Sequence, residues 1–597
     1  MRRLRVSLIA GAVATSVGLV AACGDDRGAF VVPPAVFDTP PDAGVEDAEV
    51  CYRQCSLDGR SIVDSCTGSL LETCADDLAC GEARCQEPCA AAEAERSSHG
   101  CEFYFTKPLH IYPNINSCLG TFVVNATSAP AKLTLEREGA ALDISRALFR
   151  AVSNSTDLEP LGDGVIPPGE SAILFVSDWD PTKPRSLGDR LYHSGCPTIA
   201  VPAFQGDLPS SVSHFGNAFH LKSDVPVGVT WMYPYGGAST HYPTATLAFP
   251  VSSWSQEHIV VNGWQAHGLG VPMTQIFAAE DGTEVTIVGR QNVSSVEGFS
   301  GGPAGVPAKI ELAKGQYIQL GQTEELTGSF VSSNKPVVTV GGHQCTFLPS
   351  GSPACDMLAQ QIPAFEQWGS EYVGVGYRPR TATTAEIVWY RMVGGRDGTV
   401  LDYDPIKPAG APLTLSAGEL VLFTARSDEA FVVRSRDSDH PFYLGMHMTG
   451  GAGDPPEAPS YGGMGDPEFV NVVPTGQFMG AYSFYADPSF PEHSLVVVRK
   501  KTYGAFKDVW LECAGVLTDW KPIDAQGQYE YRRVDLSRTF GPGESFGEST
   551  CKTGMQRMRS EGAFSATLWG WGVAASYAYP GGMAFRKLVE TPLAPVK

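Results

Sequence analysis

An internal repeat of about 110 residues constrains the fold of this chain more than any other feature of its sequence. A strand-like run carrying Ser-x-x-Pro, or a variant of it, occurs four times, and each copy continues into β-forming residues and a Gly- or aromatic-rich turn. The copies align on Pro226, Pro336, Pro441 and Ala563, at intervals of 110, 105 and 122 residues. This period suits a sandwich of roughly seven to nine strands, whereas a propeller blade has only about 40–50 residues. We therefore predict four tandem β-sandwich-like modules.

A second element recurs upstream of each copy, a turn in which Gly is followed by Glu or Gln. These turns begin at Gly169, Gly315, Gly418 and Gly543. The turn lies 20 to 23 residues ahead of the aligned position in the last three repeats and 57 residues ahead in the first. We therefore expect an insertion in the first module, roughly over residues 178–213.

The first 22 residues have the pattern of a bacterial secretory signal. Three arginines precede an apolar stretch, Leu8 to Val20, that is too short for a good membrane span. The run 19–23, Leu-Val-Ala-Ala-Cys, resembles a lipobox and predicts lipidation at Cys23, although an ordinary Ala-x-Ala-like cleavage site with a chance Cys is the alternative. Because several acyl chains anchor a protein stably, we expect a lipid-anchored protein at the bacterial outer membrane or cell surface.

The cysteines indicate an oxidising compartment. Fifteen cysteines less Cys23 leave an even number, as disulfides require. Eight of them lie within residues 51–101 without a paired CxxC, a density that predicts a small disulfide-rich module rather than a metal site. We expect the other six to pair locally, as Cys118 with Cys196, Cys345 with Cys355 and Cys513 with Cys551. No metal or cofactor is predicted.

Charge and composition complete the predicted organisation. The net charge of −22, with no basic cluster, disfavours a nucleic-acid partner and leaves the lipid anchor as the expected membrane contact. Residues 24–50 carry seven acids, one base and four prolines, which is typical of an extended tether. The predicted segments are a signal peptide (1–22), a lipidated tether (23–50), a disulfide-rich module (51–101) and β-modules at 102–250, 251–365, 366–465 and 466–597.

Several ordered motifs resemble the IgGFc-binding protein N-terminal domain family. They are Ala278–Thr283, Leu312–Gln316, Leu326–Ser329, Lys335–Val337 and Gly342–Cys345, followed by Cys355-Asp356-Met357-Leu358, Gln361, Pro363, Trp368-Gly369 and Tyr372. A looser similarity runs from Phe122 to about Gly582, and predicted myxobacterial lipoproteins set a similar Cys-rich stretch before this region. The resemblance implies an extracellular binding or adhesion module for a protein or glycan ligand, and it transfers no ligand residues.

Five aromatic side chains are candidates for ligand contact. Trp569 and Trp571 share one strand face, as do Trp231, Tyr233 and Tyr235. If exposed, such a stripe stacks on sugar rings or forms a binding hot spot, and if buried, it is sandwich core.

Enzymatic motifs have weaker support. Ser545 stands in a formal GxSxG, yet no His follows it in the chain, and His343 beside Cys345 competes with a predicted disulfide. Ser177-Asp178-Trp179-Asp180 has alternating carboxylates, interpreted as an exposed acidic loop. We predict no catalytic residues and expect a binding protein; a hydrolase with an unrecognised site and a structural envelope component are the alternatives.

Overall fold

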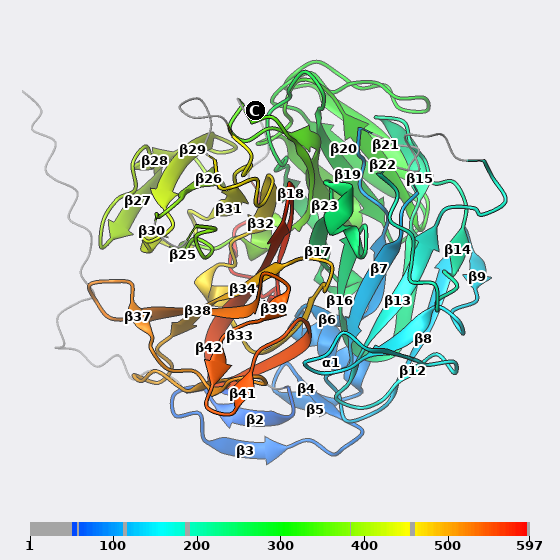
Figure 1. Ribbon diagram of the computed structural model, residues 1–597. Helices are drawn as coiled ribbons and strands as arrows, with labels where there is room; N and C mark the ends of the chain where they lie inside the picture. Colours follow the sequence, from blue (N-terminus) through cyan, green and yellow to red (C-terminus); the bar gives the residue numbers. More distant parts are fainter. Residues whose placement is uncertain are drawn as a thin grey trace, which may run out of the picture. The chain divides into compact units, whose positions relative to one another are not determined.

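The computed structural model describes residues 51–593, with gaps at 57–58, 112–115, 185–191, 351, 382–383 and 454–459. These described residues all belong to one compact unit (Figure 1). The predicted signal peptide, lipidated Cys23 and tether lie outside the described residues. None of the helices in the described ranges has the length and apolar character of a membrane span.

In three repeats the motif forms the long central strand of a sheet, and in the third repeat it forms two strands in two separate four-stranded sheets, which we count together as the sheet of that module. These strands are β16 (Phe219–Tyr233), β23 (Phe330–Thr346), β30 (Phe431–Ser435) with β31 (Phe442–Met448), and β42 (Gly554–Gly572). In the third repeat a turn that ends at Pro441 divides the central strand into two. β-branched and aromatic residues dominate these runs, and such side chains fit a pleated, buried surface.

All four central strands have the same antiparallel partners in the same chain order. The N-terminal half of each central strand pairs with two strands. These are β6 (His99–Phe105) and β8 (Ala131–Arg137) in the first module, β18 (Ser255–Ile259) and β20 (Thr283–Val288) in the second, β25 (Glu371–Gly374) and β27 (Thr399–Asp404) in the third, and β33 (Met479–Ala486) and β35 (Val509–Leu511) in the fourth. The C-terminal half pairs with two more strands. In the same order of modules, these are β7 (Leu119–Val124) and β17 (Thr244–Ala248), then β19 (Pro272–Ala278) and β24 (Asp356–Ile362), then β26 (Ile387–Gly394) and β32 (Glu468–Asn471), and finally β34 (Glu492–Lys500) and β43 (Ala575–Pro580).

Each module has a further strand on its outer side, and this strand begins directly after a Gly turn. These strands are β13 (Ser171–Asp178), β22 (Gln316–Gly321), β29 (Leu420–Arg426) and β38 (Tyr529–Arg538). In the fourth module the equivalent turn is Gly527-Gln528, because Gly543 follows β38 instead of preceding it. The four turn glycines have φ between 64° and 73°, where a side chain is unfavourable. The assignment of Gly543 to this repeat is therefore wrong.

The modules close into a ring instead of extending as an open array. β17 contacts β24, β24 contacts β32, β32 contacts β43, and β43 contacts β17, so these four inner strands surround a common axis. Figure 1 shows the four sheets following one another in blue-cyan, green, yellow-green and orange. This radial arrangement resembles that of a propeller, which the length of the repeat had argued against. The period excludes a short blade, but it does not exclude closure of longer modules around an axis.

Equivalent residues of successive modules bond to one another around the ring. Short 3₁₀ helices separate the modules at Val251–Ser253, Phe365–Gln367 and Thr475–Gln477. The side-chain amide of Gln367 donates to the Ser253 backbone carbonyl at 2.6 Å, and the side-chain amide of Gln477 donates to the Gln367 backbone carbonyl at 3.1 Å. The two residues joined by each of these hydrogen bonds are thus separated along the chain by about one repeat of the modules.

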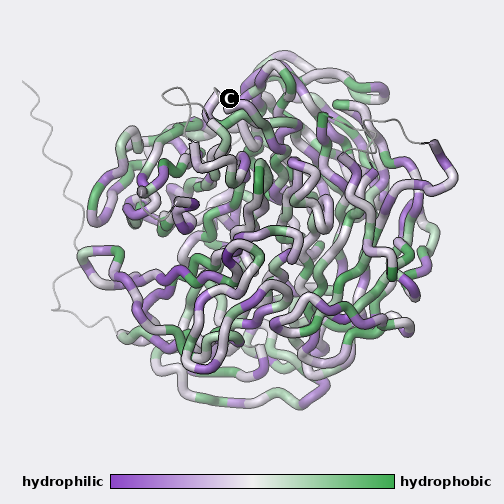
Figure 2. Tube along the Cα trace, in the orientation of Figure 1, coloured by the Kyte–Doolittle hydropathy of each residue, from purple (hydrophilic) through white to green (hydrophobic). Residues whose placement is uncertain are grey.

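The core is shared among modules. One hydrophobic cluster contains residues of all four sheets, and a second joins Phe122 and Phe175 of the first module to Tyr485 and Tyr577 of the fourth. Outer strands such as β21 (Pro307–Leu312) alternate exposed and buried residues, and hydrophobic and hydrophilic colours mix along the chain in Figure 2. The all-β class with several sheets is confirmed.

The disulfide-rich region comes first in the described chain. It contains a sheet of β1 (Arg53–Cys55), β2 (Ser61–Asp64) and β3 (Leu70–Thr73), a hairpin of β4 (Ala79–Gly81) and β5 (Arg84–Gln86), and helix α1 (Pro88–Glu95). Its four bridges are Cys51–Cys66, Cys55–Cys80, Cys74–Cys85 and Cys89–Cys101. Since β6 spans residues 99–105, the predicted boundary at 101/102 falls inside a strand of the first sheet.

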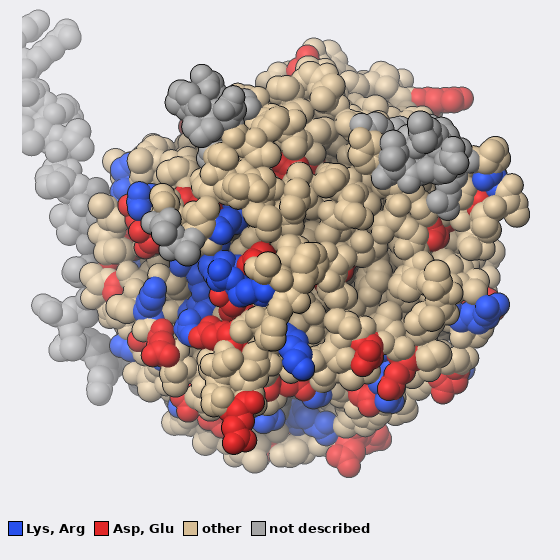
Figure 3. Space-filling model, viewed as in Figure 1, with Lys and Arg blue, Asp and Glu red and all other residues tan. Residues whose placement is uncertain are grey.

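Ion pairs join the third and fourth modules. Arg378 pairs with Glu492 at 2.6 Å and with Asp535 at 2.7 Å, and Arg533 donates to the Gly376 carbonyl at 2.9 Å. Charged side chains of both signs gather left of centre in Figure 3. Because the Arg378 guanidinium and the Glu492 carboxylate are largely shielded from water, their pairing orients the two sheets more strongly than an exposed pair does.

Candidate functional site

Four hairpin loops meet where the inner strands begin. We define the axial mouth as residues 234–243, 347–350 with 352–355, 449–453 with 460–467, and 572–574. The Gly465 amide donates to the Gly572 carbonyl at 2.6 Å, and the Gly450 amide donates to the Leu348 carbonyl at 2.8 Å. A His241 ring nitrogen lies 3.1 Å from the Val573 carbonyl. Every loop of the mouth thus bonds to a loop of another module.

Three carboxyl groups form the floor of the axial mouth. Asp356 and Glu468 are the first residues of β24 and β32, and Asp466 lies two residues before β32. Their exposed fractions are 0, 0 and 1%, respectively. Burial raises the pKa of each carboxyl well above its usual range, and the neighbouring Asp466 and Glu468 carboxylates raise the pKa of Asp356 further.

The hydrogen bonds of these carboxyl groups are incomplete. Asp356 Oδ1 accepts from the Met357 amide at 2.8 Å, and Glu468 Oε1 accepts from the Phe469 amide at 2.7 Å. Thr244, the first residue of β17, donates weakly to Glu468 at 3.4 Å. Among the residues that the structure describes, Asp356 Oδ2, both oxygens of Asp466 and Glu468 Oε2 have no hydrogen bond of ordinary geometry, although the Ser576 and Ala578 backbone amides of β43 lower the pKa of Asp356 and Glu468 in part. Buried polar atoms in that state are uncommon and call for an explanation.

The cation nearest to Asp466 is already paired. Arg380 lowers the pKa of Asp466 somewhat, but its guanidinium lies 2.8 Å from Glu386, and both side chains are fully buried. Arg380 also donates to the Thr449 and Met464 carbonyls at 2.6 and 3.0 Å. Its main role is therefore to hold the two ends of the third mouth loop together.

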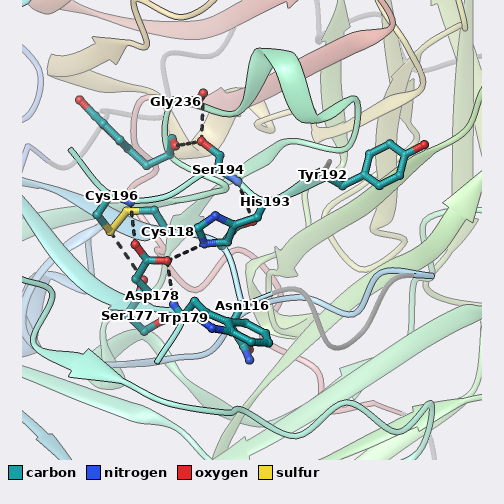
Figure 4. A network of polar contacts seen from close by, with 12 residues as sticks. Asn116, Cys118, Ser177, Asp178, Trp179, Tyr192, His193, Ser194, Cys196 and Gly236 are labelled. Carbon is teal, nitrogen blue, oxygen red and sulfur yellow. Dashed lines mark hydrogen bonds and ion pairs between the residues drawn. A yellow bond between two sulfur atoms is a disulfide. The ribbon is translucent and has the colours of Figure 1, made fainter. Parts of the chain in front are cut away.

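The insertion of the first module forms a polar network beside the mouth (Figure 4). Asp178, at the end of β13, accepts from the Trp179 amide at 2.7 Å and from the Cys196 amide at 2.8 Å, and it lies 2.8 Å from His193 Nε2. Its side chain is 14% exposed. The prediction of an exposed acidic loop is therefore wrong for Asp178, because three donors converge on this carboxylate.

The same network supports the first mouth loop. Ser194 Oγ lies 3.2 Å from the Tyr235 carbonyl and 3.3 Å from the Gly236 carbonyl, and Ser194 and Gly236 are labelled in Figure 4. Tyr242 donates to the Tyr192 carbonyl at 2.7 Å. The Cys118–Cys196 disulfide fixes the segment that carries Ser194. The insertion thus braces one wall of the axial mouth.

The predicted binding aromatics are buried. Trp231, Tyr233, Tyr235, Trp569 and Trp571 are all core residues, so their interpretation as a surface binding stripe is wrong and the core alternative holds. They lie on or directly after the central strands β16 and β42, whose faces are covered by neighbouring modules. Tyr235, for example, bonds to the Tyr485 hydroxyl of the fourth module at 2.8 Å.

The six cysteines beyond residue 101 form the three local pairs that the sequence predicts. They are Cys118–Cys196, Cys345–Cys355 and Cys513–Cys551. His343 is fully buried, burial lowers its pKa to about 3, and Cys345 is oxidised, so these two residues do not form a nucleophile–base pair. Ser545 lies in the exposed hairpin strand β40 (Ser545–Phe546), where it bonds to Thr550.

One group of metal-type ligands is closely gathered within the described ranges. Cys51, Asp64 and Cys66 have ligand atoms within 4.8 Å of one another. Since Cys51 and Cys66 are bonded to each other, they offer no thiolate, and the group does not make a metal site.

Sequence reasoning missed the floor residues, although a signal for them exists. Thr244, Asp356 and Glu468 are spaced by 112 residues, the period of the modules, and each opens an inner strand. A polar residue that recurs with the repeat at the start of an apolar strand indicates a position on the axis. In the sequence, Asp356 stands out only through the family motif Cys-Asp-x-Leu.

Taken together, the sheets and the seven bridges among the described residues define an all-β, disulfide-bonded protein. The family model described as IgGFc binding protein matches residues 244–570, more than half of the chain. This chain therefore belongs to the IgGFc-binding protein family. The match begins at the first residue of β17, ends within β42 and includes all three floor carboxyls.

A similarity to a human protein also supports this family membership. The human IgGFc-binding protein is 22% identical over 327 residues, which is 54% of this chain and 6% of the human protein. The chain thus aligns with a small part of the length of that relative. The resemblance that the motifs indicated is confirmed.

Proposed function

We propose that this chain is a cell-surface binding protein that presents the axial mouth to an extracellular protein. The observation that carries the proposal is family membership over residues 244–570, the stretch that contains the second and third mouth loops. The loops are attached to a ring with a shared core, and rigid attachment limits the entropy lost on binding. A glycan ligand is less favoured, because the five aromatic side chains that the sequence singled out for stacking on sugars lie in the core.

The rim of the mouth offers an apolar contact. Val573, at the turn between β42 and β43, is 61% exposed, and the exposed His241 lies beside it. A single exposed valine is common on protein surfaces, so Val573 serves as a reporter position at the mouth and not as evidence of a hot spot. Val516 is 49% exposed on the hairpin of β35 and β36 (Gly515–Val516), away from the mouth, and it provides a matched control position.

Site-specific photo-crosslinking on intact cells tests this proposal. A crosslinking amino acid in place of Val573 is expected to trap one extracellular protein, and the same amino acid in place of Val516 is not. Immobilised human IgG Fc fragment, with Fab as control, is the first purified probe. Adducts of the chain only with itself would favour the envelope-component alternative, and equal labelling from both positions would overturn the role of the mouth.

The proposed surface location depends on the anchor at Cys23. Cys23→Ala is expected to move the protein from the membrane fraction to the soluble fraction, because a lipobox cysteine is the acylation site. Intact mass of the membrane-extracted protein, with and without reduction, measures the lipid and the disulfides together. An unlipidated mature protein would remove surface display and return the secreted hydrolase to consideration.

A further inference from the structure

Four large apolar or aromatic side chains are exposed close to one another, and we call them the basal patch. Tyr52, Leu70 and Leu71 belong to the disulfide-rich region, and Tyr503 belongs to a hairpin of the fourth module. Their exposed fractions are 65, 63, 50 and 44%, respectively. In Figure 1, β2 and β3 of this region lie along the lower edge. Single exposed apolar residues are common, whereas a group of them indicates a contact surface.

The register of the small sheet brings the patch together. Gln54 on β1 pairs with Val63 on β2, and Val63 pairs with Leu70 on β3, so these three side chains share one face. Tyr52 stands two residues before Gln54, and strand alternation turns it to the same face. The Gln54 side-chain amide donates to the Tyr503 hydroxyl at 3.2 Å. The fourth module therefore contributes its tyrosine to this face.

The basal patch lies at the end of the inner strands opposite the axial mouth. β34 begins where Glu492 pairs with Trp571 beside the fourth mouth loop, and it ends at Lys500, just before the hairpin of the patch. β43 also begins at the mouth, and beyond its far end the Met583 carbonyl accepts from the Ser98 amide at 2.7 Å. This bond attaches the start of β6, and with it the disulfide-rich region, at that end. A surface that covers the patch therefore leaves the mouth accessible.

The place where the described chain begins indicates what covers the patch. It begins at Cys51, directly before Tyr52, and residues 24–50 separate this point from the predicted lipid anchor at Cys23. A chain of that length spans at most about 100 Å when fully extended and about 30 Å on average when flexible. An anchored chain thus enters the described structure at the edge of the patch and keeps the patch within reach of the bilayer.

The hairpin that carries Tyr503 is locally basic, although the whole chain has a net charge of −22. Lys500, Lys501 and Lys507 lie on both sides of Tyr503 in the sequence, and Lys501 Nζ lies 5.3 Å from the centre of the Phe506 ring. Ammonium groups beside an apolar surface suit lipid phosphates. A two-fold contact between copies of the patch would instead bring these like charges together, so the charge favours lipid over a second copy.

We infer that the basal patch rests on the lipid bilayer that holds the anchor and thereby directs the axial mouth away from the membrane. The inference rests on the proposed anchoring at Cys23. Leu70 and Leu71 insert at the boundary of the acyl chains, because burial of apolar surface favours this position. Tyr52 and Tyr503 lie at the level of the headgroups, where a tyrosine ring is buried and its hydroxyl stays hydrated.

Photo-crosslinking to lipid tests the inference. The full-length lipidated protein, with benzoylphenylalanine in place of Tyr503, is reconstituted in vesicles of phosphatidylethanolamine with a minority of phosphatidylglycerol and an alkyne-tagged lipid. Position 503 is expected to form at least about fivefold more lipid adducts than position 573 at the mouth, because only the patch contacts the bilayer. Equal yields would overturn the inference, and so would adducts of the chain only with itself.

A variant of the patch provides the second measurement. Leu70→Ser combined with Leu71→Ser is expected to lower the adduct yield at position 503 at least about threefold while the acyl anchor keeps the protein on the vesicles. Leu413→Ser, at a leucine of the third module that is 59% exposed, is the matched control and should leave the yield unchanged. A membrane-bound protein without lipid adducts would overturn the docking of the patch alone. An unlipidated protein that stays in solution would overturn both the anchor and the docking.

Discussion

At the scale of single residues, several polar groups are buried where central strands meet their neighbours. His258 on β18 is 1% exposed, and its Nε2 lies 3.1 Å from the Ser255 carbonyl and 3.0 Å from the Val337 carbonyl. Burial lowers the pKa of His258 to about 4, and the hydrogen bonds to these two carbonyls, with the Glu366 carboxylate, oppose this only in part. The imidazole is therefore neutral in the folded protein at neutral pH.

His258 makes folding sensitive to acid. Its folded pKa lies below the ordinary value of 6.5, so the unfolded chain takes up a proton first as the pH falls, and stability is lost between pH 6.5 and about 4. In His258→Gln the amide still donates to the Val337 carbonyl but does not titrate. Between pH 7 and 5 the wild type should lose about 2 kcal/mol more than the variant.

Urea unfolding with intact disulfides measures this difference. Above pH 7 the two proteins should differ by a constant amount, which serves as the internal control, because the other buried histidines are common to both. Parallel stability curves from pH 7 to 5 would show that His258 is not held neutral by burial.

At the scale of elements, the Gly turns before the outer strands also connect modules. Gly418, in the turn before β29, lies against Gly328 of the second module, and a Cβ on Gly418 would stand 2.5 Å from the Gly328 carbonyl oxygen. Arg290 bonds the Ala417 carbonyl at 3.2 Å in the same contact. This turn therefore needs glycine twice, for its φ of 68° and for the close approach.

Comparison of two glycine variants separates the cost of the positive φ from the cost of the close backbone approach. Gly398 has a φ of 72° and nothing within 4 Å of its Cβ position. Gly398→Ala should cost about 1 kcal/mol from conformation alone, and Gly418→Ala should cost about 2 kcal/mol more because the backbones must separate. Urea unfolding measures both. Equal losses would show that the inter-module contact yields without cost.

At the scale of the whole molecule, closure of the ring makes the modules interdependent. Contact between β17 and β43 joins the first module to the last, and the largest hydrophobic cluster draws on all four sheets. A β-module removed from the ring would expose apolar surface on both flanks. The four modules therefore differ from independently folding domains arranged in series.

Calorimetry tests this interdependence. Residues 51–593 are expected to unfold in one main transition instead of four, and a chain that ends at residue 474 is expected to lose protection against proteolysis in its first three modules. Both results follow from the loss of the apolar contacts that close the ring. Separate transitions, or a truncated chain as resistant as the full one, would mean that the modules are stable alone.

The sequence by itself determined the local features of this protein. The period of the motif located the four central strands, because β-formers, turn glycines and Ser-x-x-Pro act over a few residues. The placement of two cysteines in each of three predicted modules predicted the pairs 118–196, 345–355 and 513–551, since local pairing keeps each bridge within one module. Ordered motifs from residue 278 to 372 were sufficient to identify the family, because their order and spacing are a property of the chain alone.

Only the tertiary structure decided which faces are inside and where the site lies. The alternation of Trp569 and Trp571 describes a strand face, but ring closure buried that face. Asp178 and the floor carboxyls look like surface acids in the sequence, because the turn that folds His193 and Cys196 back onto Asp178 and the distant Thr244 beside Glu468 are set by the tertiary structure. Burial depends on contacts between modules, and these contacts carry no local signal in the chain.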